Sequence, residues 1–318
     1  MRTIGVLALM ICGCNAPSRQ QSCTPSTGST GKYVVSEWKT PVQSSDYAYD
    51  LNGDGIKDNA LGALIVTFAG KGLDTQSGIT KAVKEGAAVE LLQWGSSDAT
   101  FQSDTCASVV GYVGQKTTAP PKFDGSDVFA KDSSVAASGQ FTGPIQSGTF
   151  NSSSPVTAQT PVTLTLMLPL LGGDAPVELD LTAGHVQFTS EPGGHLMQGQ
   201  LNGAIQMADV QNKLVPALAR SLTVEGQTNP KALMLFDTGG DPDPSCTGAC
   251  KNPDATCAVT GDKKIDVCEV TGNATIKSLL LPDVQLFTTS DPYDPSAANT
   301  MMDSLSLGLS FCATEASY

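Results

Sequence analysis

The chain has 318 residues, a formal net charge of −13, 15% charged residues, 6% aromatic residues and 32 glycines. This acidic balance excludes a nucleic-acid groove, which needs Lys and Arg against phosphates, and it excludes attachment to anionic lipid head groups by charge. The many Gly, Ser, Thr and Val residues favour short strands joined by turns.

The first residues predict export. After a positive start, an apolar run extends from Ile4 to Cys12, which is too short to span a bilayer and is typical of a secretory signal. The run ends in Ile-Cys-Gly-Cys at residues 11–14, which resembles the lipobox of bacterial lipoproteins. That resemblance implies that residues 1–13 are removed and that Cys14 is acylated. The alternative is an ordinary signal peptide that is cleaved near Ala16.

The segment after Cys14 consists mainly of Ser, Thr, Gln, Pro and Gly as far as Gly31. Such a composition cannot bury enough apolar surface to fold. We therefore expect residues 14–31 to form a lipidated flexible tether, and residues 32–318 to form a single β-rich domain.

The first half of this domain is predicted to be mixed. A strand begins at Lys32 and carries Trp38 as an early aromatic anchor. Apolar residues at 61, 64, 65 and 68 have helical spacing within Asn59–Phe68, and a second, capped helix is predicted over Asp74–Glu85. The segment Val89–Leu92 then has the composition of a strand.

The strongest motif is the acidic segment from Asp50 to Asp58. It reproduces the first nine positions of an EF-hand calcium loop, in which alternate residues point inward so that their oxygens converge on one hard cation. Gly55 allows the sharp turn at position 6, and Leu61 stands where the bidentate Glu of position 12 is expected. The site therefore resembles the shorter Asp-rich calcium loops of extracellular modules, or it needs a carboxylate from elsewhere. An acidic turn without metal is the alternative. The predicted Ca²⁺ ligands are Asp50, Asn52, Asp54, Asp58 and the carbonyl of Ile56.

The second half of the domain is dominated by predicted strands. Val162–Leu168 and Val177–Leu181 alternate apolar and polar residues, as half-buried strands do. A helix over Asp209–Leu222 is interrupted by Pro216, which would kink it. Further strands are predicted at Ala232–Phe236, Ile276–Leu281 and Leu305–Phe311. This order predicts a mainly β protein, an antiparallel sandwich or barrel-like body with a few short peripheral α-helices.

A second, broken calcium loop is predicted near the C-terminus. Residues 262–269 match positions 5 to 12 of an EF-hand, with Asp262 at position 5 and Glu269 at position 12. Thr260 and Ala258 stand where the first ligands are expected and are not the acidic residues that a loop needs there. However, Asp237 begins a segment that looks like the opening of a loop. We expect an EF-hand-like loop split by a Cys-rich insertion at 244–268. A degenerate loop that holds no ion is the alternative.

The sequence contains nine cysteines, of which Cys12 leaves with the signal and Cys14 takes the lipid. Export favours disulfides over a zinc site, because oxidation removes the thiolates that zinc needs and because paired C-x-x-C knuckles are missing. Cys23, Cys106 and Cys312 form an odd set, and the sequence does not say which of them pair. The predicted disulfide cysteines are Cys246, Cys250, Cys257 and Cys268.

No familiar catalytic pattern is present. His185 and His195 lack the spacing of a zinc protease motif, and both are interpreted as ordinary polar residues. A nucleophile elbow, a phosphate-binding loop and a dinucleotide fingerprint are all missing. We therefore do not expect an enzyme, and the alternative is an extracytoplasmic hydrolase of envelope or extracellular polymers with unidentified carboxylates.

The sequence as a whole resembles an uncharacterised family of Gram-negative bacterial lipoproteins. The likeness rests on the lipobox, on Tyr-Val-Val at residues 33–35, on the DLNGDG-x-x-DN-x-LG segment at 50–62, and on the EF-hand-like segment at 262–269. It implies a calcium-stabilised lipoprotein with a structural or binding role in the cell envelope, anchored to a membrane by lipid. Asn15 after the acylated cysteine favours the outer membrane. A protein or glycan partner is not indicated.

Overall fold

In the computed structural model the chain is described over residues 23–25, 28–155, 162–171, 175–191, 195–237, 263–286 and 302–318. The predicted signal peptide and Cys14 lie outside these ranges, as do Asp262, Cys246, Cys250 and Cys257. No helix in the described ranges is long and apolar enough to cross a membrane.

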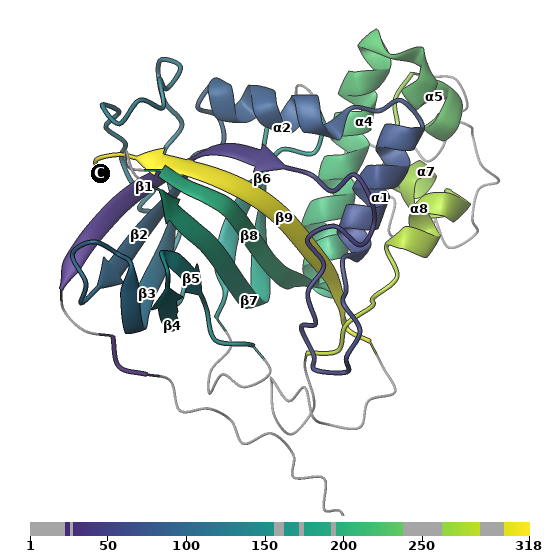
Figure 1. The fold of residues 1–318 in the computed structure, drawn as a ribbon. Coiled ribbons are helices and arrows are strands. Elements are labelled where there is room, and N and C mark those ends of the chain that lie inside the picture. Colours follow the sequence, from purple (N-terminus) through teal and green to yellow (C-terminus); the bar gives the residue numbers. More distant parts are fainter. Residues whose placement is uncertain are drawn as a thin grey trace, which may run out of the picture.

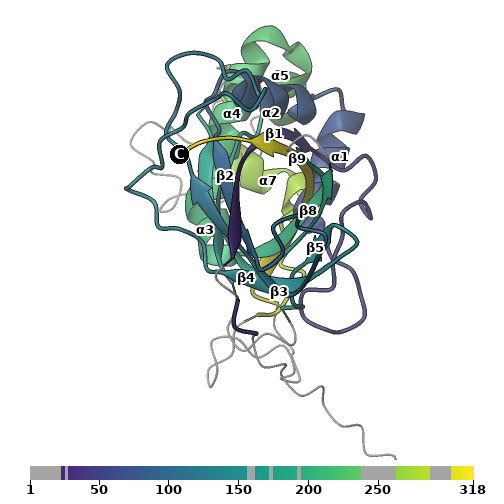
Figure 2. The ribbon, with the colours of Figure 1, turned by 60° about the vertical axis from the view of Figure 1, so that its left-hand side comes forward.

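The architecture is mainly β, as predicted. Nine antiparallel strands form one sheet with the order β5-β4-β3-β2-β1-β9-β8-β7-β6. The short strand β5 also pairs with β7, so the sheet closes on itself, and Figure 2 shows the strands arranged around a ring. The strands are β1 (Ser29–Lys39), β2 (Glu90–Ser96), β3 (Ser103–Val113), β4 (Phe141–Gln146), β5 (Thr149–Asn151), β6 (Leu164–Leu168), β7 (Val177–Glu191), β8 (His195–Gln206) and β9 (Ser304–Glu315).

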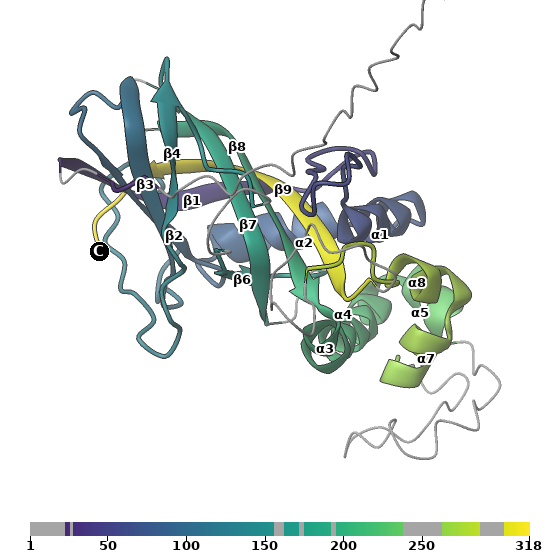
Figure 3. The ribbon, with the colours of Figure 1, turned by 90° about the horizontal axis from the view of Figure 1, so that it is seen from below.

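The helices lie outside this sheet. Helix α2 packs along β1, and α1, α4, α5, α7 and α8 gather at one end of the sheet (Figures 1 and 3). Their bounds are α1 (Ala60–Gly70), α2 (Thr75–Lys84), α3 (Met207–Asp209), α4 (Val215–Thr228), α5 (Pro230–Phe236), α7 (Val267–Gly272) and α8 (Ala274–Leu279).

Local sequence signals explain the first two helices. Asn59 caps α1 by accepting from the N–H of Gly62, and Asp74 caps α2 by accepting from the N–H of Ser77. A π-helical segment (η1, Val210–Leu214) precedes α4, where the N–H of Val215 donates to the carbonyl of Val210. This wider turn comes immediately before Pro216, which lacks an N–H and disturbs α-helical hydrogen bonding.

Two predicted strands are wrong. Residues 232–236 belong to α5 and residues 276–279 belong to α8. Both helices begin at an asparagine cap, Asn229 followed by Pro230 in the first helical position and Asn273 before α8. These start signals outweigh the apolar composition of the short segments that follow them.

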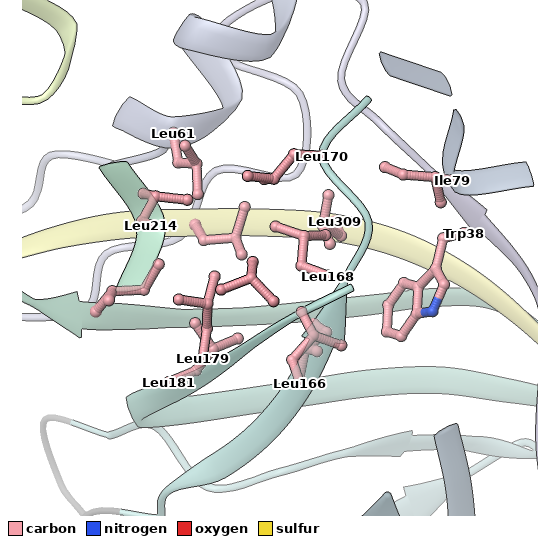
Figure 4. Packing of buried hydrophobic residues seen from close by; sticks show 14 of the residues in the cluster. Trp38, Leu61, Ile79, Leu166, Leu168, Leu170, Leu179, Leu181, Leu214 and Leu309 are labelled. Atoms are coloured by element: carbon pink, nitrogen blue, oxygen red, sulfur yellow. The ribbon is translucent and has the colours of Figure 1, made fainter. Parts of the chain in front are cut away.

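The core fills the interior of the closed sheet and continues under the helices. Leu166 of β6, Leu179 and Leu181 of β7 and Leu309 of β9 converge there, and Leu61 of α1 covers them from the helical end (Figure 4). All five side chains are buried almost completely. Their burial supplies the main driving force for folding.

The folded region begins before Lys32. Strand β1 starts at Ser29, and Cys23 forms a disulfide with Cys106 of β3. A flexible tether can therefore not extend through residue 31, because the chain is already fixed to the sheet at Cys23. Among the described residues Cys312 is a free thiol, while Cys268 is disulfide-bonded.

Candidate metal-binding loops

The acidic loop at residues 50–58 is fastened to the outside of the sheet. Its two ends pair in a β-bridge between Tyr49 and Asp58, and the N–H of Asp58 donates to the carbonyl of Tyr49 at 3.1 Å. The Tyr49 ring stacks on the ring of His185 in β7 with centroids 3.9 Å apart. Leu51 is fully buried in a small cluster on the face of the sheet away from the main core, with Ala183, Ala204, Val284 and Leu286.

The backbone of the loop has the turns that an EF-hand loop needs. Both oxygens of Asp50 accept from backbone N–H groups, one from Gly53 at 2.6 Å and the other from Gly55 at 3.0 Å. Gly53 and Gly55 have φ angles of 78° and 85°, a region that favours glycine. Gly55 thus supplies the sharp turn expected at position 6.

The other predicted ligands line the same loop. Asn52 Oδ1 accepts from the N–H of Asp54 at 3.2 Å, and Asp54 Oδ1 accepts from the N–H of Ile56 at 2.7 Å. The Ile56 side chain is exposed, so this residue can contribute its carbonyl oxygen without losing core contacts. The side chains of Asp50, Asn52 and Asp54 therefore turn their oxygens toward backbone N–H groups of the loop.

Asp58 is the most perturbed carboxyl of the loop. Burial, together with the nearby carboxylates of Asp283, Asp54 and Asp50, raises its pKa to about 7, and burial is the largest of these causes. Its Oδ2 atom is buried and has no hydrogen-bond partner among the described residues. None of the ion pairs found in the described ranges involves these four acids, so their repulsion is not relieved by a basic side chain.

Asp283 is the carboxylate that the sequence does not place. It lies in the segment between α8 and β9, far from the loop in the chain, and accepts from the N–H of Ser306 in β9 at 2.8 Å. Burial is the main cause that raises its pKa. Leu61, at position 12, is buried in the core as part of α1 and cannot supply a ligand. No local signal could have identified Asp283, because only the pairing of residues 283–284 with Ser304 brings it to the loop.

In the described part of the chain, no group of three or more His, Cys, Asp or Glu side chains is arranged to hold a metal ion. The loop 50–58 therefore has the backbone of a calcium loop, while its carboxylates do not converge on one point. Metal binding requires rotation of Asp50 and Asp54 away from the N–H groups that they accept from. Asp54 is exposed and Asp50 is partly exposed, which leaves room for this rotation.

The second predicted loop is described only in part, because Asp262 lies outside the described residues. Glu269 is the third residue of α7 and forms a capping box with Asp266, whose N–H donates to Glu269 Oε2 at 3.0 Å. Asp237 Oδ2, directly after α5, accepts from the N–H of Lys263 at 3.0 Å, and Lys263 has a φ of 64°. In the first loop Asp50 likewise accepts from the backbone N–H of a residue with positive φ, Gly55.

The two histidines lie on neighbouring strands, His185 within β7 and His195 at the start of β8. His185 is 3% exposed, and burial lowers its pKa to about 4, so it is neutral at pH 7. Its Nε2 atom lies 2.9 Å from Asn151 Oδ1, and its ring supports Tyr49. His185 thus helps to position the end of the acidic loop.

Comparison of the chain with protein-family models, with curated proteins and with solved structures finds no match. The candidate site consequently rests on the residues and contacts of this chain. Those contacts place the first loop at the junction of α1, β7, β8 and β9.

Proposed function

We propose that the protein is an exported bacterial lipoprotein, anchored to the cell envelope through Cys14, whose domain is stabilised by Ca²⁺ in the loop Asp50–Asp58. Its role is structural or binding, and not catalytic. The observation that carries the calcium proposal is the backbone of this loop, in which Gly53 and Gly55 adopt positive φ angles and Gly55 supplies the sharp turn of position 6. In a calcium loop this turn allows alternate side-chain oxygens to face one ion.

Electrostatics also supports a cation at this loop. Four carboxylates interact there without a basic partner in the described ranges, and one oxygen of Asp58 is buried without a hydrogen bond. A divalent cation would remove the repulsion among them and would satisfy that oxygen. Ca²⁺ accepts irregular sets of carboxylate, amide and carbonyl oxygens, which is the donor set of this segment.

The position of the loop explains why an ion there would stabilise the whole domain. Asn59, the next residue after the loop, caps α1 and also accepts from the N–H of Gly308 in β9 at 2.9 Å. Asn202 of β8 donates to the carbonyl of Tyr47 on the other side of the loop. An ion that orders residues 50–58 therefore fixes the attachment of α1 to β8 and β9.

The anchor is proposed from the sequence alone, since residues 1–22 lie outside the described ranges. The disulfide from Cys23 to Cys106 supports this arrangement in one respect, because disulfides persist in oxidising compartments outside the cytoplasm. The short segment between Cys14 and Cys23 would then separate the acylated residue from the domain. We propose the outer membrane as the location because Asn15, and not Asp, follows the acylated cysteine.

The calcium proposal is tested by thermal unfolding of the unlipidated protein from Asn15 onward, in excess Ca²⁺ and in chelator. At a Ca²⁺ concentration of about one hundred times Kd, the stabilisation is about 3 kcal/mol, which corresponds to a rise in Tm of about 5–10 °C. Asp50→Asn with Asp54→Asn should abolish this rise, because two charges are lost. Each amide oxygen can keep one turn contact, so Asn at position 50 replaces only one of the two contacts that Asp50 makes.

A matched control is Asp124→Asn with Asp132→Asn. Both of these exposed carboxylates accept from a serine N–H two residues further on, as Asp54 does from Ile56, but they lie in other loops. The control should keep the full calcium effect. Equal melting in Ca²⁺ and chelator for the unmodified protein would contradict the proposal, and a calcium effect that survives the loop substitutions would place the ion elsewhere.

A further inference from the structure

Among the described residues, one carboxyl group faces the cavity inside the closed sheet. Glu90 is the first residue of β2, is 4% exposed and shares the inward face of that strand with Leu92 and Trp94. It lines an interior cavity of about 20 Å³, which is room for about one water molecule. The other side chains that line this cavity come from β1, β2, β3, β4, β6, β7, β8 and β9, and all of them are apolar and without titratable groups.

Glu90 lies at the seam between β6 and β2, where the edge of β6 has no strand partner among the described residues. One edge of β6 pairs with β7, and its other edge faces β2 and β3 without a strand partner. At this edge the N–H of Met167 donates to Glu90 Oε1 at 2.7 Å. At the start of β6, the N–H of Gly139 donates to the carbonyl of Thr163 at 3.1 Å. Glu90 thus accepts a hydrogen bond from an N–H of β6 that would otherwise be buried without a partner.

The close fit at this seam leaves little space for a charged carboxylate and its water. A Cβ atom added to Gly111 of β3 would lie 2.5 Å from a methyl carbon of Leu164, so β3 and β6 are in tight contact. Burial raises the pKa of Glu90 to about 8, and the hydrogen bond from Met167 only partly opposes this. The folded protein therefore holds Glu90 in its neutral form at pH 7.

We propose that Glu90 is a proton-controlled latch, which holds β6 closed against the interior while it carries its proton and lets β6 open when it is ionised. An ionised carboxylate in this cavity has no counter-charge, so its stabilisation requires water to enter between β6 and β2. Opening exposes Glu90 to solvent and gives up one hydrogen bond and the packing of the β6 leucines. The latch is independent of calcium binding, because Glu90 and the acidic loop are on opposite faces of the sheet.

Hydrogen exchange measured by mass spectrometry on the protein from Asn15 onward tests this latch. Opening should become up to about tenfold more favourable per pH unit between pH 5 and pH 8, because the pKa is 4.5 when Glu90 is exposed and about 8 when it is buried. After correction for intrinsic exchange, peptides that cover 162–171 should lose protection over this range and then level off. Peptides from β9 should remain better protected than the β6 peptides at each pH, because β9 exchanges only through global unfolding.

The decisive variant is Glu90→Gln, which keeps an acceptor for Met167 and cannot ionise. Its β6 protection should be independent of pH, whereas Glu178→Gln should behave like the unmodified protein. Glu178 is an exposed residue of β7 directly opposite Met167, so it controls for the loss of a nearby acid. The latch is refuted if β6 protection in Glu90→Gln falls with pH as in the unmodified protein. It is also refuted if the β6 and β9 peptides of the unmodified protein are equally protected at every pH, which would mean that β6 opens only by global unfolding. A β6 protection that does not fall with pH refutes it as well, and neither result needs a variant to fold.

Discussion

The disulfide between Cys23 and Cys106 gives a quantitative prediction. It joins the segment before β1 to β3 over a sequence separation of 83 residues, and the loop that it closes contains β1, α1, α2 and β2. Removing such a cross-link increases the conformational entropy of the unfolded chain. The chain-entropy model puts the resulting loss of stability at about 4.5 kcal/mol at 25 °C. Cys23→Ser with Cys106→Ala should therefore lower the free energy of unfolding by about this amount.

Urea unfolding at fixed Ca²⁺ concentration is the suitable assay, because it gives both a midpoint and a slope. Loss of the cross-link lets the unfolded chain expand, so the slope m should rise while the midpoint falls. Cys312→Ala removes the free thiol, leaves the disulfide intact and serves as the control for cysteine substitution. A decrease of less than about 1 kcal/mol with an unchanged slope would refute the chain-entropy reasoning.

Two further predictions concern single side chains. Glu90→Gln should remove a pH dependence of stability. The folded state binds the Glu90 proton more tightly than the unfolded state, so the unmodified protein loses stability as pH rises from 4.5 to about 8. The loss is at most about 5 kcal/mol, and stability changes little above pH 8. Urea midpoints from pH 5 to 9 measure this, and parallel pH profiles for the two proteins would contradict it. Asp74→Ala should cost about 1 kcal/mol, because the N–H of Ser77 loses the cap of α2; the same assay measures the loss, and Glu85→Ala at the other end of the helix should have a smaller effect.

The fold class could be predicted from the sequence because its signals are local. Alternation in Leu305–Phe311 indicates a strand, and Asn59 and Asp74 mark the starts of α1 and α2. The segments at 232–236 and 276–279 were predicted with the wrong type, because in so few residues apolar composition does not distinguish a strand from a capped helix. At these two segments the asparagine caps predict the secondary structure better than the apolar composition does.

The candidate sites divide in the same way. The backbone turns of residues 50–58 follow from Asp50, Gly53 and Gly55, which are close in the chain. Asp283 could not be placed, because it reaches the loop only through the pairing of its segment with β9. Glu90 had a weak signal, since it shares the parity of Leu92 and Trp94, but a lone acid in a strand is ordinarily assigned to the solvent face. Contacts between segments far apart in the chain determine where both Asp283 and Glu90 lie.

The place of β9 in the sheet determines when the domain can form. It is the last strand in sequence, yet it lies between β1 and β8 and pairs with both. Until Ser304–Glu315 is in place, these two strands face each other across a missing partner, and each offers an open hydrogen-bonding edge to other chains. Chains that stop before β9 therefore cannot complete the sheet and become candidates for aggregation and proteolysis.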